Sequence, residues 1–220
     1  HGSPSVAMPG FEIDILNDHG DILPTGELGS IAIKLPLPPS CLTTIWGADE
    51  AFVDKYLTTF TGYYESGDAG FCDDDGYLYI MARTDDVINV AGHRLSTGQL
   101  EEVLADHPDI AECAVIGVAD QLKGQLPLGL ICLYSTSQRK AEDIIAEAID
   151  LVRSRVGRVA ALNQIVVVER LPKTRSGKVL RGTVAKIADG TDWTMPATID
   201  DPVILDEITA ALRTIGYAGS

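Results

Sequence analysis

A change in residue pattern at Asp85-Asp86 is the feature that most constrains how this chain can fold. Before it, Phe11, Ile13 and Ile15 alternate with charged residues, as antiparallel strands do when one face lies in a core. After it, strand-like runs and helical apolar spacing are mixed, which predicts a compact α+β unit. Two adjacent like charges suit an exposed joint better than a buried strand. We therefore expect a β-rich region over 1–84, a mixed domain over 85–190 and a tail with one helix over 191–220.

Turn and capping residues predict where several elements begin and end. Asp49 is the expected N-cap of the first helix, and Ser96 with Gln99 forms a capping-box pattern before a helix that ends near Asp106. Asp201 followed by a proline indicates another helix start in the tail. Asp-Gly chemistry predicts a hairpin turn over 73–76. The other expected elements are strands over 87–90, 110–118, 128–134 and 165–169 and helices over 141–156 and 178–188.

Charge and composition bound the kinds of ligand. The net charge of −15 argues against nucleic-acid and anionic-membrane binding, because both need a broad positive field. Nine of the 17 lysines and arginines nevertheless lie between Arg153 and Lys186, which indicates a small polyanionic ligand. No apolar run is long enough to span a membrane, and four isolated cysteines, Cys41, Cys72, Cys113 and Cys132, are typical of reduced thiols. We expect a soluble intracellular protein.

The segment 172–181, Pro-Lys-Thr-Arg-Ser-Gly-Lys-Val-Leu-Arg, concentrates anion-binding groups around a glycine. A phosphate-binding P-loop would need glycine at Pro172 and serine or threonine at Val179, so that reading fails. Two readings remain on the residues alone. The segment is either a solvated basic turn or a loop that delivers the Lys178 ammonium to a negatively charged reaction centre.

Three motifs in this order resemble the adenylate-forming acyl-CoA synthetases: Tyr-Tyr-Glu-Ser-Gly-Asp at 63–68, Arg-Thr-Asp-Asp-Val-Ile-Asn-Val-Ala-Gly-His-Arg at 83–94, and Pro-Lys-Thr-Arg-Ser-Gly-Lys at 172–178. The resemblance runs from about residue 3 to residue 202. Segments 33–39 and 86–94 look most like propionyl-CoA synthetase, with acetyl-CoA synthetase the near alternative. The resemblance implies the last β-rich part of a large ATP-binding domain, followed by a small mobile α+β lid domain.

In this family a carboxylate and ATP give an acyl-adenylate and pyrophosphate, and the CoA thiol then displaces AMP. The resemblance implies Lys178 as the catalytic residue and as a candidate acylation site, and Asp85 as the hinge. It implies nucleotide binding by Asp68, Arg83 and Arg94, and CoA binding by Ala91, Gly92 and Arg153. It also implies a metal held by the backbone carbonyls of Ala105, His107 and Ile110.

Simpler readings stay open for these residues. Asp68 is also a plausible turn residue, Arg83 a surface ion pair, Asp85 an ordinary linker, and the three carbonyls simply water-bound. Arg155 or Arg158 is an alternative to Arg153 as the CoA ligand. Acetate-activating members of the family often have serine where Ala91 stands, so the resemblance implies a backbone contact rather than a side-chain hydrogen bond at this position. Ala82 likewise replaces the commoner glycine.

The implied ligands are ATP, CoA, Mg²⁺ and a short-chain carboxylate, propionate before acetate. These residues contain no ATP loop and no acyl pocket, so we expect the main Mg²⁺ site in an N-terminal part of the enzyme and no catalysis by residues 1–220 alone. The alternative function is a non-catalytic CoA- or nucleotide-binding or docking module. The expected compartment is the cytoplasm, or the mitochondrial matrix in a eukaryote, and the sequence does not indicate the oligomeric state.

Overall fold

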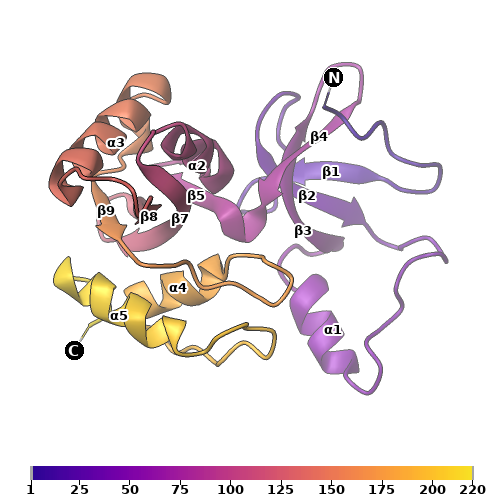
Figure 1. Cartoon of the computed structure of the whole chain (residues 1–220). Coiled ribbons are helices and arrows are strands. Elements are labelled where there is room, and N and C mark those ends of the chain that lie inside the picture. The colour runs from indigo at the N-terminus through magenta and orange to yellow at the C-terminus, as the bar shows by residue number, and fades with distance from the viewer. Residues whose placement is uncertain (1, 220) are drawn as a thin grey trace. The chain divides into compact units, whose positions relative to one another are not determined.

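The computed structural model describes residues 2–219, and in it the chain divides after Asp85 into two compact units (Figure 1). The side chain of Asp85 lies outside the described residues. The first unit is built on one antiparallel sheet and the second combines a sheet with four α-helices, so the expected α+β class is confirmed. No helix within residues 2–219 is both long enough and apolar enough to cross a membrane.

The first unit contains a four-stranded antiparallel sheet in the order β1-β2-β3-β4. Its core holds Leu16, Ala32 and Phe60, and helix α1 places Tyr56 against Tyr64 with ring centroids 5.2 Å apart. The sheet thus provides the frame for the residues that its last two strands carry. The elements are β1 (Ile13–Leu16), β2 (Gly29–Lys34), α1 (Asp49–Tyr56), β3 (Tyr63–Cys72) and β4 (Leu78–Arg83).

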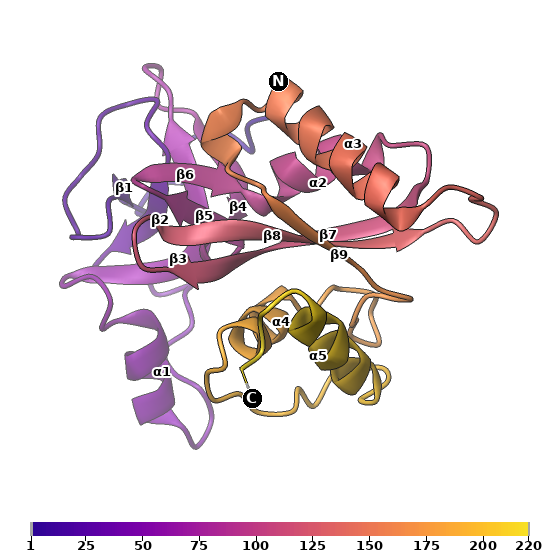
Figure 2. The ribbon, with the colours of Figure 1, turned by 90° about the vertical axis from the view of Figure 1, so that its left-hand side faces the viewer.

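The second unit is a sheet between two layers of helices. Strands β6, β5, β8 and β7 pair antiparallel in that order, and β9 adds to β8 in parallel. Helices α2 and α3 cover one face, and α4 and α5 cover the other (Figure 2). The elements are β5 (Val87–Val90), β6 (His93–Ser96), α2 (Thr97–Ala105), β7 (Ile110–Asp120), β8 (Gly124–Leu133), α3 (Ala141–Arg155), β9 (Gln164–Val167), α4 (Arg181–Ala188) and α5 (Ile204–Thr214).

Successive residues of β7 supply both cores of this unit. Ala114, Ile116 and Val118 pack with α4 and α5, whereas Val115 packs with α2 and α3. This follows from the two-residue period of a strand, which sends neighbouring side chains to opposite faces. A strand buried on both faces reads as a continuous apolar run, which is why the sequence predicts β7 well.

Burial also accounts for the state of two of the four thiols. All four cysteines are free, as expected. Burial raises the pKa of the Cys113 and Cys132 thiols to about 11, so both are neutral near pH 7. They fill space in the core of the second unit.

The expected helix starts agree with the structure to different degrees. Ser96 is the N-cap of α2, as expected, although its side chain makes no capping hydrogen bond. Asp49 is the first residue of α1 rather than its N-cap. Helix α5 begins at Ile204 with Val203 as its N-cap, two residues later than expected, and Asp201 accepts the Val203 N–H at 3.1 Å ahead of the helix. Helix α4 begins three residues later than expected, because residues 173–179 form a hairpin instead.

Candidate functional site

Asp68, in the middle of β3, and Arg83, at the end of β4, are brought together by the pairing of these strands. They are direct partners across the two strands, and the Arg83 Nε lies 3.7 Å from the Asp68 carboxylate. Arg83 Nε also donates to the Gly67 carbonyl at 2.9 Å, which fixes the guanidinium over the strand. The Asp68 side chain is 37% exposed. A carboxylate held by a neighbouring cation yet open to solvent is suited to accept the two hydroxyls of a ribose.

Gly67 is required for this arrangement. Its φ is +78°, in the region that favours glycine, and a Cβ there would lie 3.3 Å from the Arg83 Nη2 atom. Ser66 Oγ donates to the Ile31 carbonyl at 2.6 Å and accepts the Asp68 N–H at 3.1 Å. The Ser-Gly-Asp sequence therefore holds the Asp68 backbone against the central strands of the sheet.

Ala91 and Gly92 form the two-residue turn between β5 and β6. Both have positive φ, +50° and +86°, as a tight hairpin turn of this type requires. The Ala91 N–H donates to the Lys123 carbonyl at 2.8 Å, and the Gly92 N–H donates to Asn89 Oδ1 at 3.0 Å. The turn is exposed and tied to the β7–β8 turn, so a ligand can approach its backbone. Arg94 follows on β6, opposite Asn89.

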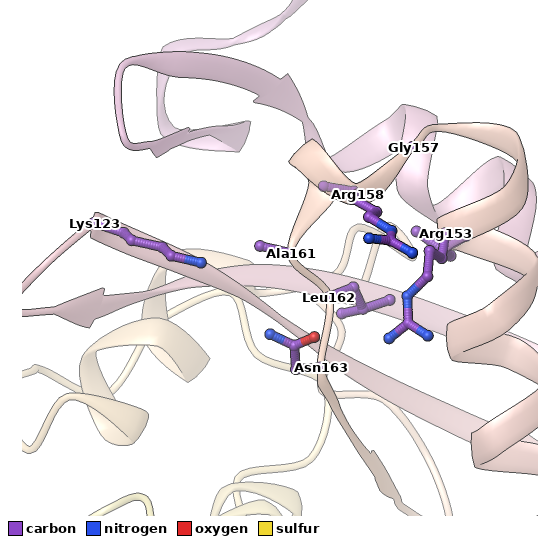
Figure 3. Close-up of a pocket in the computed structure, with 9 residues that line it drawn as sticks. Lys123, Arg153, Gly157, Arg158, Ala161, Leu162 and Asn163 are labelled. Carbon is purple, nitrogen blue, oxygen red and sulfur yellow. The ribbon is translucent and has the colours of Figure 1, made fainter.

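Arg153 lines a cavity of about 330 Å³ at the end of α3 (Figure 3). Its guanidinium is paired with Asp150 at 3.0 Å, and Arg158 and Lys123 line the same cavity. Arg155 instead pairs with Asp106 and is not among the lining residues. Of the three arginines considered from the sequence, the structure therefore brings together Arg153 and Arg158.

Lys123 and Asn163 belong to this cavity but were missed in the sequence. Lys123 lies in the β7–β8 turn, far from Arg153 along the chain, and Asn163 lies in the segment between α3 and β9. Tertiary structure brings Lys123 to the other two, because no local spacing links it to them. A cavity with three cationic side chains and one amide is suited to phosphate oxygens.

Lys178 lies on a hairpin in which the Thr174 N–H donates to the Lys178 carbonyl at 2.8 Å. The Lys178 N–H donates to Thr174 Oγ1 at 3.1 Å, and Gly177 makes the turn with φ +84°. Lys178 itself is exposed. The hairpin thus fixes the lysine backbone and leaves the long side chain able to reach a ligand.

Arg181 anchors the end of the Lys178 segment, a contact that the sequence did not indicate. Its guanidinium donates two hydrogen bonds of 2.8 Å to the Glu101 carboxylate, and these raise the Arg181 pKa above its ordinary value. Glu101 also accepts the Val115 N–H at 2.8 Å. Arg181 therefore joins the start of α4 to α2 and β7.

The expected metal site at Ala105, His107 and Ile110 stays a prediction. The His107 carbonyl accepts the Ile110 N–H at 3.1 Å but keeps a second lone pair, and carbonyl oxygens are suitable ligands for hard cations. The His107 ring is buried, with Nδ1 accepting the Asp109 N–H at 3.2 Å and Nε2 3.3 Å from the Glu147 carboxylate. These contacts fix the loop after α2.

Residues 99–178, from α2 to the lysine of the hairpin, match the family model described as the AMP-binding enzyme C-terminal domain. The chain is 53% identical over 212 residues to an uncharacterized protein of Pseudomonas aeruginosa, covering 96% of this chain and 34% of that protein. It is 43% identical to mouse mitochondrial acyl-CoA synthetase short-chain family member 3, over 96% of this chain and 31% of that protein.

Further similarity extends to a bacterial relative and to a solved structure. Identity to the propionate–CoA ligase of Escherichia coli is 42%, over 96% of this chain and 35% of the ligase. The acetoacetyl-CoA synthetase of Streptomyces lividans has the same fold, with a TM-score of 0.81 and 21% identity over 98% of this chain and 32% of that one. The chain belongs to the adenylate-forming, AMP-forming short-chain acyl-CoA synthetases. It spans about a third of the length of the curated relatives it matches.

Proposed function

We propose that this chain is the C-terminal part of a ligase that converts a short-chain carboxylate, ATP and CoA into an acyl-CoA thioester, AMP and pyrophosphate. Propionate is the favoured carboxylate and acetate the next. The name of the similar E. coli enzyme, propionate–CoA ligase, supports propionate. The N-terminal part of the enzyme would supply the acyl pocket and the main Mg²⁺ site.

The cationic cavity is the observation that carries the proposal. This protein has a net charge of −15, yet Lys123, Arg153 and Arg158 line one cavity. Gathering like charges is unfavourable unless anions offset them, and Asp150, paired with Arg153, supplies one negative charge for three positive ones. CoA carries phosphate groups, and the exposed turn at Gly92 is tied to the backbone of Lys123, which offers a surface for the pantetheine arm.

We assign the remaining residues to the nucleotide and to the first half-reaction. Asp68 accepts the ribose hydroxyls, while Arg83 and Arg94 contact the nucleotide. The Lys178 ammonium stabilises the negative charge that develops as the carboxylate attacks the α-phosphate and pyrophosphate leaves. Mg²⁺, bound with ATP, would neutralise phosphate charge. The second half-reaction, attack of the CoA thiol on the acyl-adenylate, releases AMP and needs no pyrophosphate stabilisation.

Replacement of Arg153 tests the CoA assignment. In a full-length synthetase that carries these residues, Arg153→Ala should raise the KM for CoA about tenfold or more, the scale of one lost charge-assisted contact. ATP–pyrophosphate exchange should stay near the wild-type rate, because CoA takes no part in that step. Steady-state kinetics with varied CoA and the exchange assay measure the two effects.

Arg155→Ala is the matched control, because Arg155 lies on the same helix but pairs with Asp106 outside the cavity. An equal rise in KM for both variants would contradict a specific role of the cavity. Retained CoA binding by a full-length protein that forms no thioester from any short-chain acid would favour the other function, a CoA- or nucleotide-binding or docking module.

The proposed compartment is the cytoplasm, or the mitochondrial matrix if the protein comes from a eukaryote. The mouse relative is named as mitochondrial and the bacterial relative is an E. coli enzyme, which is consistent with both. The proposed partners are the small-molecule substrates and the N-terminal part of the same enzyme.

A further inference from the structure

A segment from the C-terminal part of the chain, Thr198–Asp200, lies along the hairpin that carries Lys178. The Arg175 N–H donates to the Thr198 carbonyl at 3.0 Å, and the Asp200 N–H donates to the Lys173 carbonyl at 3.0 Å. Thr174 and Ile199 are bridge partners between these two hydrogen bonds. The segment therefore acts as a third strand of the hairpin.

The hairpin needs such support. Its own pairing is short: the Lys173–Val179 bridge, the backbone bonds of Thr174, and the Leu180 N–H donating to the Pro172 carbonyl at 2.9 Å. Lys173 adds an ion pair to Glu112 at 2.7 Å at the base. A hairpin of two short strands is marginally stable in water, and a third strand with an apolar anchor stabilises it. The tip, from Arg175 to Lys178, is exposed on this frame.

The third strand is itself fixed to the core. Ile199 is only 5% exposed and belongs to the cluster that includes Leu205 and Ile208 of α5. Burial of the isoleucine side chain is favourable, and it holds the strand in place. Just beyond it, Asp201 pairs with Arg170 at 2.7 Å. The hairpin is thereby coupled to the packing of α5 on the sheet.

We propose that Thr198–Asp200 is a positioning strand, which holds the Lys178 hairpin in the geometry needed for adenylation. It lies beyond residues 99–178, where the family model matches. The inference rests on the proposed role of Lys178. It adds that part of the adenylation rate depends on backbone hydrogen bonds from a segment that carries no catalytic group.

Two substitutions at one position separate the backbone from the side chain. Asp200→Pro removes the N–H that bonds to Lys173 and favours an extended Ile199, which the bridge already requires. Asp200→Ala removes the carboxylate and keeps the N–H. In the full-length synthetase, Asp200→Pro should lower kcat for ATP–pyrophosphate exchange about tenfold or more, because small misplacements of catalytic groups are costly. Asp200→Ala should stay near wild type.

Four further readouts distinguish positioning from general loss of structure. In Asp200→Pro, the KM for ATP and the conversion of preformed acyl-adenylate to acyl-CoA should be unchanged. Amide hydrogen exchange should accelerate in peptides covering 173–179 and not in β7. In a Lys178→Ala background, Asp200→Pro should cause no further loss, because the positioned group is already absent. Ile199→Ala should give the same pattern through the apolar anchor.

Equal rates of ATP–pyrophosphate exchange in Asp200→Pro and Asp200→Ala would overturn the proposal of a positioning strand. A parallel fall of both half-reactions in Asp200→Pro would overturn it as well. If Asp200→Pro does not fold, Ile199→Ala decides by the same criteria. The proposed function fails separately: it is wrong if Lys178→Ala leaves adenylation intact, whatever the Asp200 variants do.

Discussion

Lys178 is the residue on which the assignment of the adenylation chemistry depends most. A preorganised cation next to developing charge is worth about a hundredfold in rate, so Lys178→Ala should lower ATP–pyrophosphate exchange by at least about that factor. Conversion of preformed propionyl-adenylate and CoA into propionyl-CoA should survive, because no pyrophosphate leaves in that step. Both reactions are measured on the same full-length enzyme.

Arg175→Ala is the control for Lys178→Ala, since it removes one charge from the exposed tip of the same hairpin and keeps the N–H that bonds to Thr198. It should leave both half-reactions near wild type. Acylation of the Lys178 amine removes the same charge and should mimic Lys178→Ala. If Lys178→Ala slowed neither reaction, the hairpin would be no more than a solvated basic loop.

At the scale of single residues, motif order predicted much of the candidate site and tertiary contacts supplied the rest. Asp68 and Arg83 belong to motifs that the sequence shows directly, and antiparallel pairing makes them neighbours. Lys123 has no motif of its own. It reaches the Arg153 cavity through the β7–β8 turn, which local sequence does not place.

The β5–β6 hairpin is an element whose turn residues can be tested directly. Ala91 has φ +50°, which costs a non-glycine residue on the order of 1 kcal/mol, whereas asparagine tolerates this region well. Ala91→Asn should therefore stabilise the protein by about 0.5–1 kcal/mol, and Gly92→Ala should destabilise it by about 1 kcal/mol. Urea unfolding of the two variants and wild type measures both changes.

A Cβ atom added at Gly92 would meet no atom within 4 Å, so the expected loss of stability in Gly92→Ala comes only from the positive φ of this residue. Gly182→Ala in α4 is a suitable comparison, because it also meets no atom within 4 Å and replaces glycine within a helix. It should stabilise the protein. If both alanine substitutions changed the free energy of unfolding in the same direction, backbone strain at position 92 would not be the main cause of the effect of Gly92→Ala.

Element prediction was most accurate where burial sets the pattern. Strand β7 is an apolar run buried on both faces, and α3 buries Ile144, Ala148 and Val152 at helical spacing. It was less accurate at the start of β8, which begins at Gly124 rather than at Leu128, and where polar contacts compete at helix starts. Helix α4 starts at Arg181 rather than at Lys178, because the residues before it form the backbone hydrogen bonds of the hairpin and of the positioning strand. Strand β6 was missed because His93–Ser96 contains one aliphatic residue, Leu95, and so shows no alternating apolar pattern.

At the scale of the whole molecule, the division of the chain falls at the short 3₁₀ turn Thr84–Asp86. The sequence predicted a joint here from two adjacent acidic residues, and the family resemblance made Asp85 a hinge. That role is a proposal. Its logic is that one active site has to present different groups of the second unit to two successive half-reactions.

Proline at position 85 tests the hinge. Proline fixes its own φ near −65° and disfavours helical geometry in the residue before it, here Thr84 of the 3₁₀ turn. Asp85→Pro should therefore disfavour the present turn and restrict rotation between the units. One half-reaction should fall much more than the other, because each is proposed to need its own orientation.

Asp85→Ala is the matched variant: it removes the same carboxylate and leaves backbone rotation free. Asp85→Ala should therefore keep both half-reactions near wild type, as measured by ATP–pyrophosphate exchange and by thioester formation from preformed propionyl-adenylate. Because Asp85→Pro and Asp85→Ala lose the same charge, any difference between them reports the backbone. Equal losses in the two half-reactions of Asp85→Pro, with the fold intact by circular dichroism, would show that this turn is an ordinary linker.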